Sequence, residues 1–302
     1  MGDSRGHWGT RKKSGGTEGN KSMRRNFAIF TFVLGALVGW GSRAADDPAG
    51  SADKALMAAF EKGDKAAINK YLDPDFTWID HDGVMLFRPD ALALGMKPLV
   101  GEGGDVEIVK HPYGDQVVWL QAHSGKNFAS RFWVKRSEGW RLLHTSEIAV
   151  KEHGERVRPT YDIPCVNPCK QLPIRTIDKV QETAMANWQE QESGRQFWMK
   201  HVADDNQTVS TYGGQTLPKK DRPAPPEPKP GAPQVGATPV LFARLWTFGP
   251  ETVVMISCQP SYGEKAYWAS RVFHYQHGTW QMAESYHNTI EASGIMTEVQ
   301  GK

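Results

Sequence analysis

The sequence predicts an α+β protein in which one small domain occurs twice in tandem. The first observation is an internal repeat: residues 128–133 read Phe-Ala-Ser-Arg-Phe-Trp, and residues 268–273 read Trp-Ala-Ser-Arg-Val-Phe, 140 positions later. The second is the order of patterns inside each copy, where helix-like segments precede a run of alternating, strand-like segments. Helices followed by antiparallel strands are typical of α+β domains whose helices pack on one face of the sheet.

The elements of the first copy follow from periodicity and turn residues. Two helix-like segments are interrupted at Gly63-Asp64, where Asp64 can cap the second helix. A strand hairpin turns at Asp82-Gly83, and Pro89 suits the first turn of a short helix. The expected helices span residues 55–60 and 65–72, and the expected strands span residues 76–79, 84–87, 106–110, 116–122, 127–135 and 140–148.

The first hairpin of the second copy aligns at a different offset from the later strands. Residues 75–83 match residues 206–214 at an offset of 131. A proline-rich insert at residues 222–233 explains most of the difference from 140. This insert is expected to be an extended surface loop, and a docking segment for a partner is the alternative.

The N-terminal region has the pattern of a secretory signal peptide. Basic residues precede an apolar run at residues 27–38, and the small residues Ser42 and Ala44 mark a cleavage site after Ala44. The run is shorter than the roughly 20 residues of a membrane span, so no span is expected after cleavage; an uncleaved anchor is the alternative. We therefore expect a periplasmic or secreted bacterial protein.

These boundaries divide the chain into six expected parts. They are residues 1–22 (a disordered extension, or sequence before a true start at Met23), 23–44 (signal peptide), 45–150 (first domain), 151–177 (linker), 178–292 (second domain, with the insert at 222–233) and 293–302 (tail).

Charge and motifs exclude several classes of function. The chain has 36 Lys and Arg and 34 Asp and Glu; residues 1–44 hold eight of the bases and two of the acids, which leaves 28 bases and 32 acids in the body. A mildly acidic body predicts no nucleic-acid partner. The sequence has no P-loop, no glycine-rich dinucleotide fingerprint and no Gly-x-Ser-x-Gly elbow, which disfavours nucleotide chemistry and serine hydrolysis.

Three cysteines fit an oxidising compartment. Cys165 and Cys169 bracket three residues of the linker, which favours a small structural disulfide loop over a metal pair or a redox centre. Cys258 lies in an apolar run and is expected to be a buried free thiol.

Residues 133–136 and 139–146 together resemble the terminal hairpin of SnoaL-like domains, a branch of the nuclear-transport-factor-2-like (NTF2-like) superfamily. Residues 75–83 resemble the first hairpin of these domains. The resemblance covers residues 52–150 well and residues 178–292 more loosely. Family members commonly have a second histidine where this chain has Ser146.

The resemblance implies two cone domains, each with a curved antiparallel sheet and helices on its concave face over a pocket. Relatives include ketosteroid isomerase, polyketide cyclases and limonene epoxide hydrolase, whereas others only bind ligands or assemble through their sheets. The two copies are therefore expected to form an intrachain pseudo-dimer. Because the fold hosts many activities, function must be argued from the site.

An isomerase or cyclase of this class needs a carboxylate base and hydrogen-bond donors in an apolar cavity. Asp80 is the candidate base, with Trp78 on the same strand face, and His144 and Arg131 are candidate donors. The alternative is that Asp80 belongs to a solvated turn. In the second copy Thr211, Tyr212 and Glu284 take the places of Asp80, His81 and His144.

The arginines of the repeated triplet, Arg131 and Arg271, have two open interpretations. Each binds a carboxylate or enolate in its own pocket, or each forms a cross-strand ion pair. The candidate ligand-binding residues are Trp78, His81, Arg131, Tyr212, Arg271 and Glu284. No cofactor is expected, and nothing in the sequence makes Asp80, His81, Asp82 and His144 converge on a metal.

The sequence leaves three functions open. The leading hypothesis is an exported protein that binds a small, mostly apolar molecule in the first pocket. The second is an isomerase, cyclase or hydrolase that uses Asp80 as general base. The third is a non-catalytic envelope module that binds protein partners through its sheets or its proline-rich insert.

Overall fold

The computed structural model describes residues 47–152, 194–227, 242–259 and 266–291. The expected signal peptide, Cys165 and Cys169 of the linker, and the tail lie outside the described residues. All described residues belong to one compact unit, Asp46–Lys302. Within them, no helix is long and apolar enough to cross a membrane.

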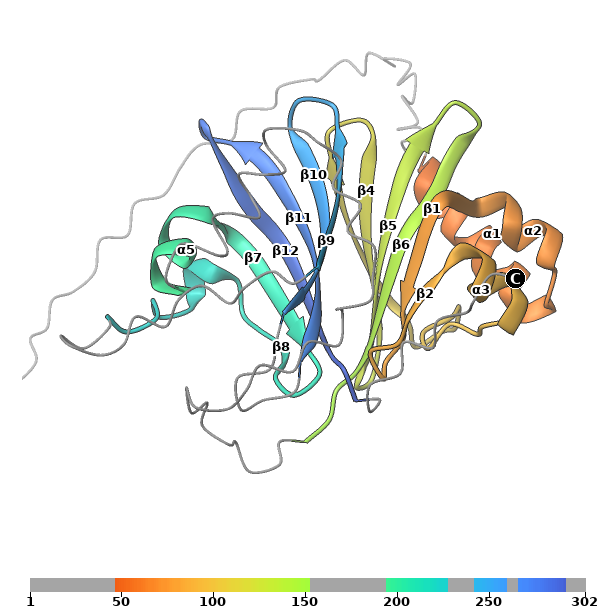
Figure 1. The fold of residues 1–302 in the computed structure, drawn as a ribbon, viewed down its shortest axis with the longest axis horizontal. Coiled ribbons are helices and arrows are strands. Elements are labelled where there is room, and N and C mark those ends of the chain that lie inside the picture. Colours follow the sequence, from red (N-terminus) through yellow and green to blue (C-terminus); the bar gives the residue numbers. More distant parts are fainter. Residues whose placement is uncertain (1–46, 153–193, 228–241, 260–265, 292–302) are drawn as a thin grey trace, which may run out of the picture. The chain divides into compact units, whose positions relative to one another are not determined.

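The described residues form two six-stranded sheets with the same topology (Figure 1). The strand order is β2-β1-β6-β5-β4-β3 in the first sheet and β8-β7-β12-β11-β10-β9 in the second. The strands are β1 (Leu72–Ile79), β2 (Met85–Phe87), β3 (Glu107–Tyr113), β4 (Val117–Ser124), β5 (Asn127–Arg136), β6 (Gly139–Ala149), β7 (Val202–Ser210), β8 (Gly214–Gln215), β9 (Phe242–Phe248), β10 (Thr252–Gln259), β11 (Tyr267–Gln276) and β12 (Thr279–Thr289). Among the described strands, only β1 with β6 and β7 with β12 pair in parallel, so each sheet is mixed and not purely antiparallel as expected. The expected tandem α+β fold is confirmed.

The strand registers correct one detail of the sequence alignment. Leu72 pairs with Leu142 in the first sheet, and Val202 pairs with Met282 in the second. The later strands therefore repeat at an offset of 140, but the first hairpins repeat at 130 rather than 131. Two adjacent glycines, Gly213-Gly214, make either alignment look acceptable in sequence. The counterpart of Asp80 is thus Ser210, not Thr211, and that of His81 is Thr211, not Tyr212.

Three helices cover one face of the first sheet: α1 (Pro48–Lys62), α2 (Lys65–Tyr71) and α3 (Arg88–Leu94). Asp64 caps α2, because its carboxylate accepts the N–H groups of Ala66 and Ala67, as the sequence predicts. The buried residues on this face are Ala49, Ala52, Leu56, Met57, Ala59, Phe60, Ile68, Leu72, Phe76, Trp78, Ala91, Leu120, Trp133 and Leu142. In the second repeat, α5 (Gly194–His201) and a short 3-10 helix, η1 (Lys219–Asp221), accompany the sheet.

The other face of the first sheet shares an apolar core with the second sheet. Its members from the first repeat include Trp119, Phe132 and Ile148, and those from the second include Trp246, Val254 and Tyr286. The rings of Trp119 and Tyr286 meet edge to face with centroids 6.2 Å apart. Burial of this apolar area stabilises the contact between the repeats.

Candidate functional site

Asp80 shapes the turn between β1 and β2. Its Oδ1 atom accepts hydrogen bonds from the N–H groups of Asp82 (3.0 Å) and Val84 (2.8 Å). Burial raises the pKa of Asp80, and the two N–H groups oppose this shift. His81 is half-buried beside the exposed Asp82, with 3.7 Å between Nε2 and Oδ2. These contacts fit the turn interpretation of Asp80.

His144 lies between the two sheets. Its Nδ1 atom is 2.9 Å from the hydroxyl of Thr77, and its Nε2 atom is 2.8 Å from the hydroxyl of Ser270 in the second repeat. Complete burial lowers the pKa of His144 to about 3, so the ring is neutral. Its two ring nitrogens thus contact hydroxyl groups of Thr77 and Ser270 and not the carboxylate of Asp80.

A β-bulge in β6 decides which way the side chain of His144 points. Phe132 pairs with His144, but the next residue of β5, Trp133, pairs with Leu142. The extra residue in β6 shifts the alternation of its side chains, so strict period-two counting assigns the wrong faces. The same irregularity recurs in the second repeat at Val272 and Phe273.

Arg131 lies on the helix-covered face and joins the sheet to α1. Its Nη1 atom is 2.9 Å from Asp53 Oδ2, and both side chains are almost fully buried. The indole N–H of Trp133 donates to the other carboxylate oxygen of Asp53 at 3.0 Å. Arg131 Nη2 also donates to the carbonyl oxygen of Val100. This is a helix-to-sheet ion pair, not the cross-strand pair that the sequence left open.

Glu147 is a buried carboxyl group that sequence reasoning missed. Its Oε2 atom accepts the indole N–H of Trp78 at 3.2 Å, and its Oε1 atom accepts the N–H of Leu99 at 2.8 Å. Burial raises the pKa of Glu147 to about 7, although the Leu99 N–H and the charge of Arg131 lower it. The available signal was an acidic residue directly before Ile148 near the end of β6, beyond the bulge that shifts the side-chain alternation of this strand.

Residues 95–106, which we call the strap, connect α3 to β3 and contact both of these charged groups. Leu99 donates its main-chain N–H to Glu147, and Val100 accepts from Arg131. Val100 is buried against the small side chains of Ala122 and Ala129. Leu99 and Val100 of the strap, together with Arg131, Glu147 and Trp78, form a polar cluster that we call the interior centre of the first repeat.

The predicted residues of the second repeat lie in separate places. Tyr212 donates its hydroxyl to Glu291, and Arg271 Nη1 donates to the hydroxyl of Ser257 at 3.0 Å. Burial lowers the pKa of Arg271. Glu284 instead faces the first repeat, where it accepts the hydroxyl of Tyr113 at 3.2 Å. These residues do not share one site with each other or with Arg131.

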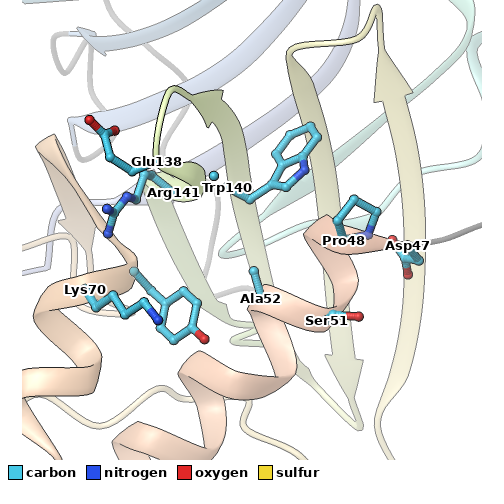
Figure 2. Close-up of a pocket in the computed structure, with 10 residues that line it drawn as sticks. Asp47, Pro48, Ser51, Ala52, Lys70, Glu138, Trp140 and Arg141 are labelled. Carbon is cyan, nitrogen blue, oxygen red and sulfur yellow. The ribbon is translucent and has the colours of Figure 1, made fainter.

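Two adjoining hollows border the helix-covered core of the first repeat, and we call them together the furrow. Their volumes are about 600 and 670 Å³. Lys70, Glu138 and Arg141 line both hollows. Figure 2 shows the first hollow, where the turn between β5 and β6 faces α1 and the end of α2. Trp140 and Tyr71 contribute aromatic surface to it.

Metal ligands do not cluster in the described ranges. No group of three or more His, Cys, Asp or Glu side chains there is arranged to hold a metal ion. Cys258 is buried and takes part in a disulfide, so the prediction of a free thiol is wrong.

Comparisons with known proteins give matches by structure alone. No family model and no curated protein sequence matches the chain. An NTF2-like protein from Rhodospirillum rubrum is 19% identical with a TM-score of 0.28, over 35% of this chain and 100% of its own. An NTF2-like protein from Cytophaga hutchinsonii is 17% identical with a TM-score of 0.25, over 33% of this chain and 93% of its own.

A putative ketosteroid isomerase from Shewanella frigidimarina is 15% identical with a TM-score of 0.25, over 34% of this chain and 95% of its own. Each of these similarities covers about one repeat.

Proposed function

We propose that the first repeat binds a small carbonyl-containing molecule beneath the strap, between Arg131 and Glu147. The supporting observation is that two main-chain groups now fill this position, the N–H of Leu99 on Glu147 and the C=O of Val100 on Arg131. A ligand with one carbonyl oxygen and one N–H or O–H donor would replace both contacts. Without such a replacement, each buried polar group left unsatisfied would cost about 1–3 kcal/mol.

The construction of the strap supports its displacement. Gly101 and Gly104 do not have positive φ angles, and a Cβ atom added to either would have no neighbour within 4 Å. The observed conformation does not require glycine there, and glycine adds backbone freedom that suits a second conformation. All six strap residues from Gly101 to Val106 are exposed or half-buried, which favours local opening over global unfolding.

The aromatic side chains around this centre suit the apolar part of the ligand that the sequence predicts. Trp78 packs edge to face with Phe60 and with Phe76, at centroid distances of 5.6 and 6.3 Å. These rings suit an apolar ligand body, while Arg131 and Glu147 would orient its polar end. The ligand is thus proposed to be apolar with one amide-like or acid-like group.

We test this proposal with N-acetyl-leucyl-valinamide, which reproduces the strap's own N–H and C=O. Nuclear magnetic resonance should show a shift of the Trp78 indole N–H, because that group bonds to Glu147. The same peptide methylated at the leucine nitrogen lacks the donor and should bind at least about tenfold more weakly. Glu147→Gln should weaken binding of the unmethylated peptide. An unchanged Trp78 signal at millimolar peptide would overturn the proposal.

A paired glycine variant tests strap opening separately. Gly101→Ala combined with Gly104→Ala should keep or raise thermal stability, because the open space accepts both methyl groups. It should slow hydrogen exchange of the Leu99 amide and weaken peptide binding. If Leu99 exchanges only by global unfolding in the unmodified protein, the strap does not open.

We also propose that the protein acts outside the cytoplasm as an intrachain pseudo-dimer. The signal-like N-terminal pattern and the disulfide of Cys258 support export, because disulfides persist in oxidising compartments. The shared apolar core and the bond from His144 to Ser270 support the pairing of the repeats. N-terminal sequencing of protein from a periplasmic extract should begin at Ala45, and a start at Met1 or Met23 would contradict cleavage.

The second candidate is a general acid–base enzyme in which Glu147, not Asp80, moves the proton. A carboxyl group whose pKa is about 7 is well matched to proton transfer near neutral pH. Deuterium uptake at the α-carbons of phenylacetone in D2O gives a direct assay. Glu147→Gln should reduce this uptake at least about 100-fold, whereas Asp80→Asn should not. Equal rates with and without protein would reject the enzyme hypothesis for this class of substrate.

A further inference from the structure

The furrow has an excess of positive charge once its ion pairs are taken into account. Three of its acids have partners: Asp73 binds Arg136 at 2.7 Å, Asp75 binds Arg244 at 3.0 Å, and Asp47 binds Lys110. The remaining acid is Glu138, at the exposed turn between β5 and β6.

Three cations of the furrow are left without a carboxylate within ion-pair distance in the described structure. Arg88 bonds to the neutral side chain of Asn69 at 2.6 Å. Lys70 lies with its Nζ atom 5.7 Å from the centre of the Tyr71 ring. Arg141 is not within ion-pair distance of Glu138. The hydrogen bond from Ser137 is the largest cause of the lowered pKa of Glu138, and the charge of Arg141 is a smaller cause. Against one acid, these three cations leave the furrow with two uncompensated positive charges.

We propose that the furrow is a second binding site, which takes a small ring-bearing carboxylate. Lys70 and Arg141 line both hollows and can hold a carboxylate where the hollows meet, with the guanidinium supplying paired donors. Trp140 and Tyr71 line the first hollow beside them and offer ring surface to the rest of the ligand. A volume of about 600 Å³ accommodates a molecule of this size.

The furrow site is independent of the site proposed beneath the strap. The furrow is lined by the start of α1, the end of α2, the start of β1, Arg88 and the turn between β5 and β6, whereas the strap site uses Glu147, Arg131 and residues 99–100. A ligand of the furrow therefore needs no opening of the strap. The two proposals can fail separately.

The test uses phenylacetate as the acid and phenylacetamide as its neutral counterpart, with calorimetry on the purified protein. Phenylacetate should bind at least tenfold more tightly than phenylacetamide. Binding should weaken when the salt concentration rises from 50 to 500 mM, because an exposed charge pair is screened. Glucuronate serves as a second acid, in which a sugar replaces the aromatic ring.

Variants assign the binding to the furrow. Arg141→Gln and Lys70→Gln should each weaken phenylacetate binding at least fivefold, and Trp140→Leu should weaken it without changing the preference for acid over amide. Lys135→Gln removes an exposed lysine outside the furrow and should leave binding unchanged. If glucuronate binds and phenylacetate does not, and if Arg141→Gln abolishes this binding, the site is supported with a sugar ring in place of the aromatic ring. Equal binding of acid and amide, or an unaffected Arg141→Gln variant, would overturn the proposal.

Discussion

The indole N–H of Trp268 donates a hydrogen bond to the carbonyl oxygen of Gly83 at 2.9 Å, which ties the second sheet to the first hairpin of the first repeat. Gly83 is buried there with a φ of 78°. A Cβ atom at this position would lie 2.6 Å from the carbonyl oxygen of Thr289 and 2.7 Å from Ile290 Cα. The hairpin therefore needs glycine both for its conformation and for the approach of the second repeat.

We expect Gly83→Ala to lower the free energy of unfolding by about 2–4 kcal/mol, because it combines backbone strain with overpacking. Gly125→Ala is the matched control, since Gly125 has a φ of 58° but open space around its Cβ position. It should lose about 1 kcal/mol from the conformation alone. Urea unfolding measures both, and equal losses would show that the two repeats do not meet closely at Gly83.

Burial of neutral His144 predicts a loss of stability in acid. Its pKa is about 3 when folded and 6.5 ordinarily, so between these values the unfolded chain binds a proton that the folded chain does not. Above pH 6.5 this group does not lower the free energy of unfolding. Between pH 6.5 and pH 3 it lowers the free energy of unfolding by about 1.4 kcal/mol per pH unit as the pH decreases. His287 has the same folded pKa and should contribute equally.

His144→Gln should remove the contribution of one histidine to the slope of unfolding free energy against pH. Urea unfolding between pH 6.5 and 4 measures this slope. The variant His144→Gln with His287→Gln should flatten it further. If the slope of the single variant equals that of the unmodified protein, His144 is not held neutral between the sheets.

The buried pair of Arg131 and Asp53 should be sensitive to removal of either partner. Arg131→Met leaves a carboxylate buried without its cation and should cost about 3–5 kcal/mol. Asp53→Leu should cost a similar amount, and the double variant should cost clearly less than the two together. Lys126→Met removes one side of the exposed pair with Glu152 and should change stability by less than about 1 kcal/mol. Additive losses in the double variant would contradict direct coupling.

The disulfide of Cys258 predicts a link to the connector between the repeats. The chain has three cysteines, so a pairing within one chain joins Cys258 to Cys165 or Cys169. Such a link competes with the small loop predicted between those two cysteines. Peptide mapping without reduction should recover a peptide that contains Cys258 joined to one from residues 151–177. Recovery of Cys165 joined to Cys169, with Cys258 alkylated, would contradict it.

The sequence predicted the helix order, the capping role of Asp64 and the repeated strands, because these depend on neighbours close in the chain. It also predicted the position of the β1–β2 turn, and the contacts of Asp80 fit the alternative that this residue belongs to the turn. It did not determine the side-chain directions of His144 and Glu147, because the bulge opposite Phe132 and Trp133 shifts the side-chain alternation of β6 by one residue. Nothing within a single strand reveals a bulge that exists only in its pairing.

The sequence by itself determined that one α+β unit occurs twice, since the repeated triplet and the hydrophobic periodicities are local and survive in each copy. Only the tertiary structure decided which polar groups meet. Arg131 finds Asp53 from α1, Glu147 finds the strap, and His144 finds Ser270 of the other repeat. Each of these pairs is separated by between 48 and 126 residues. Burial then set the pKa values of Glu147 and His144, because desolvation depends on packing from distant segments and not on the residue itself.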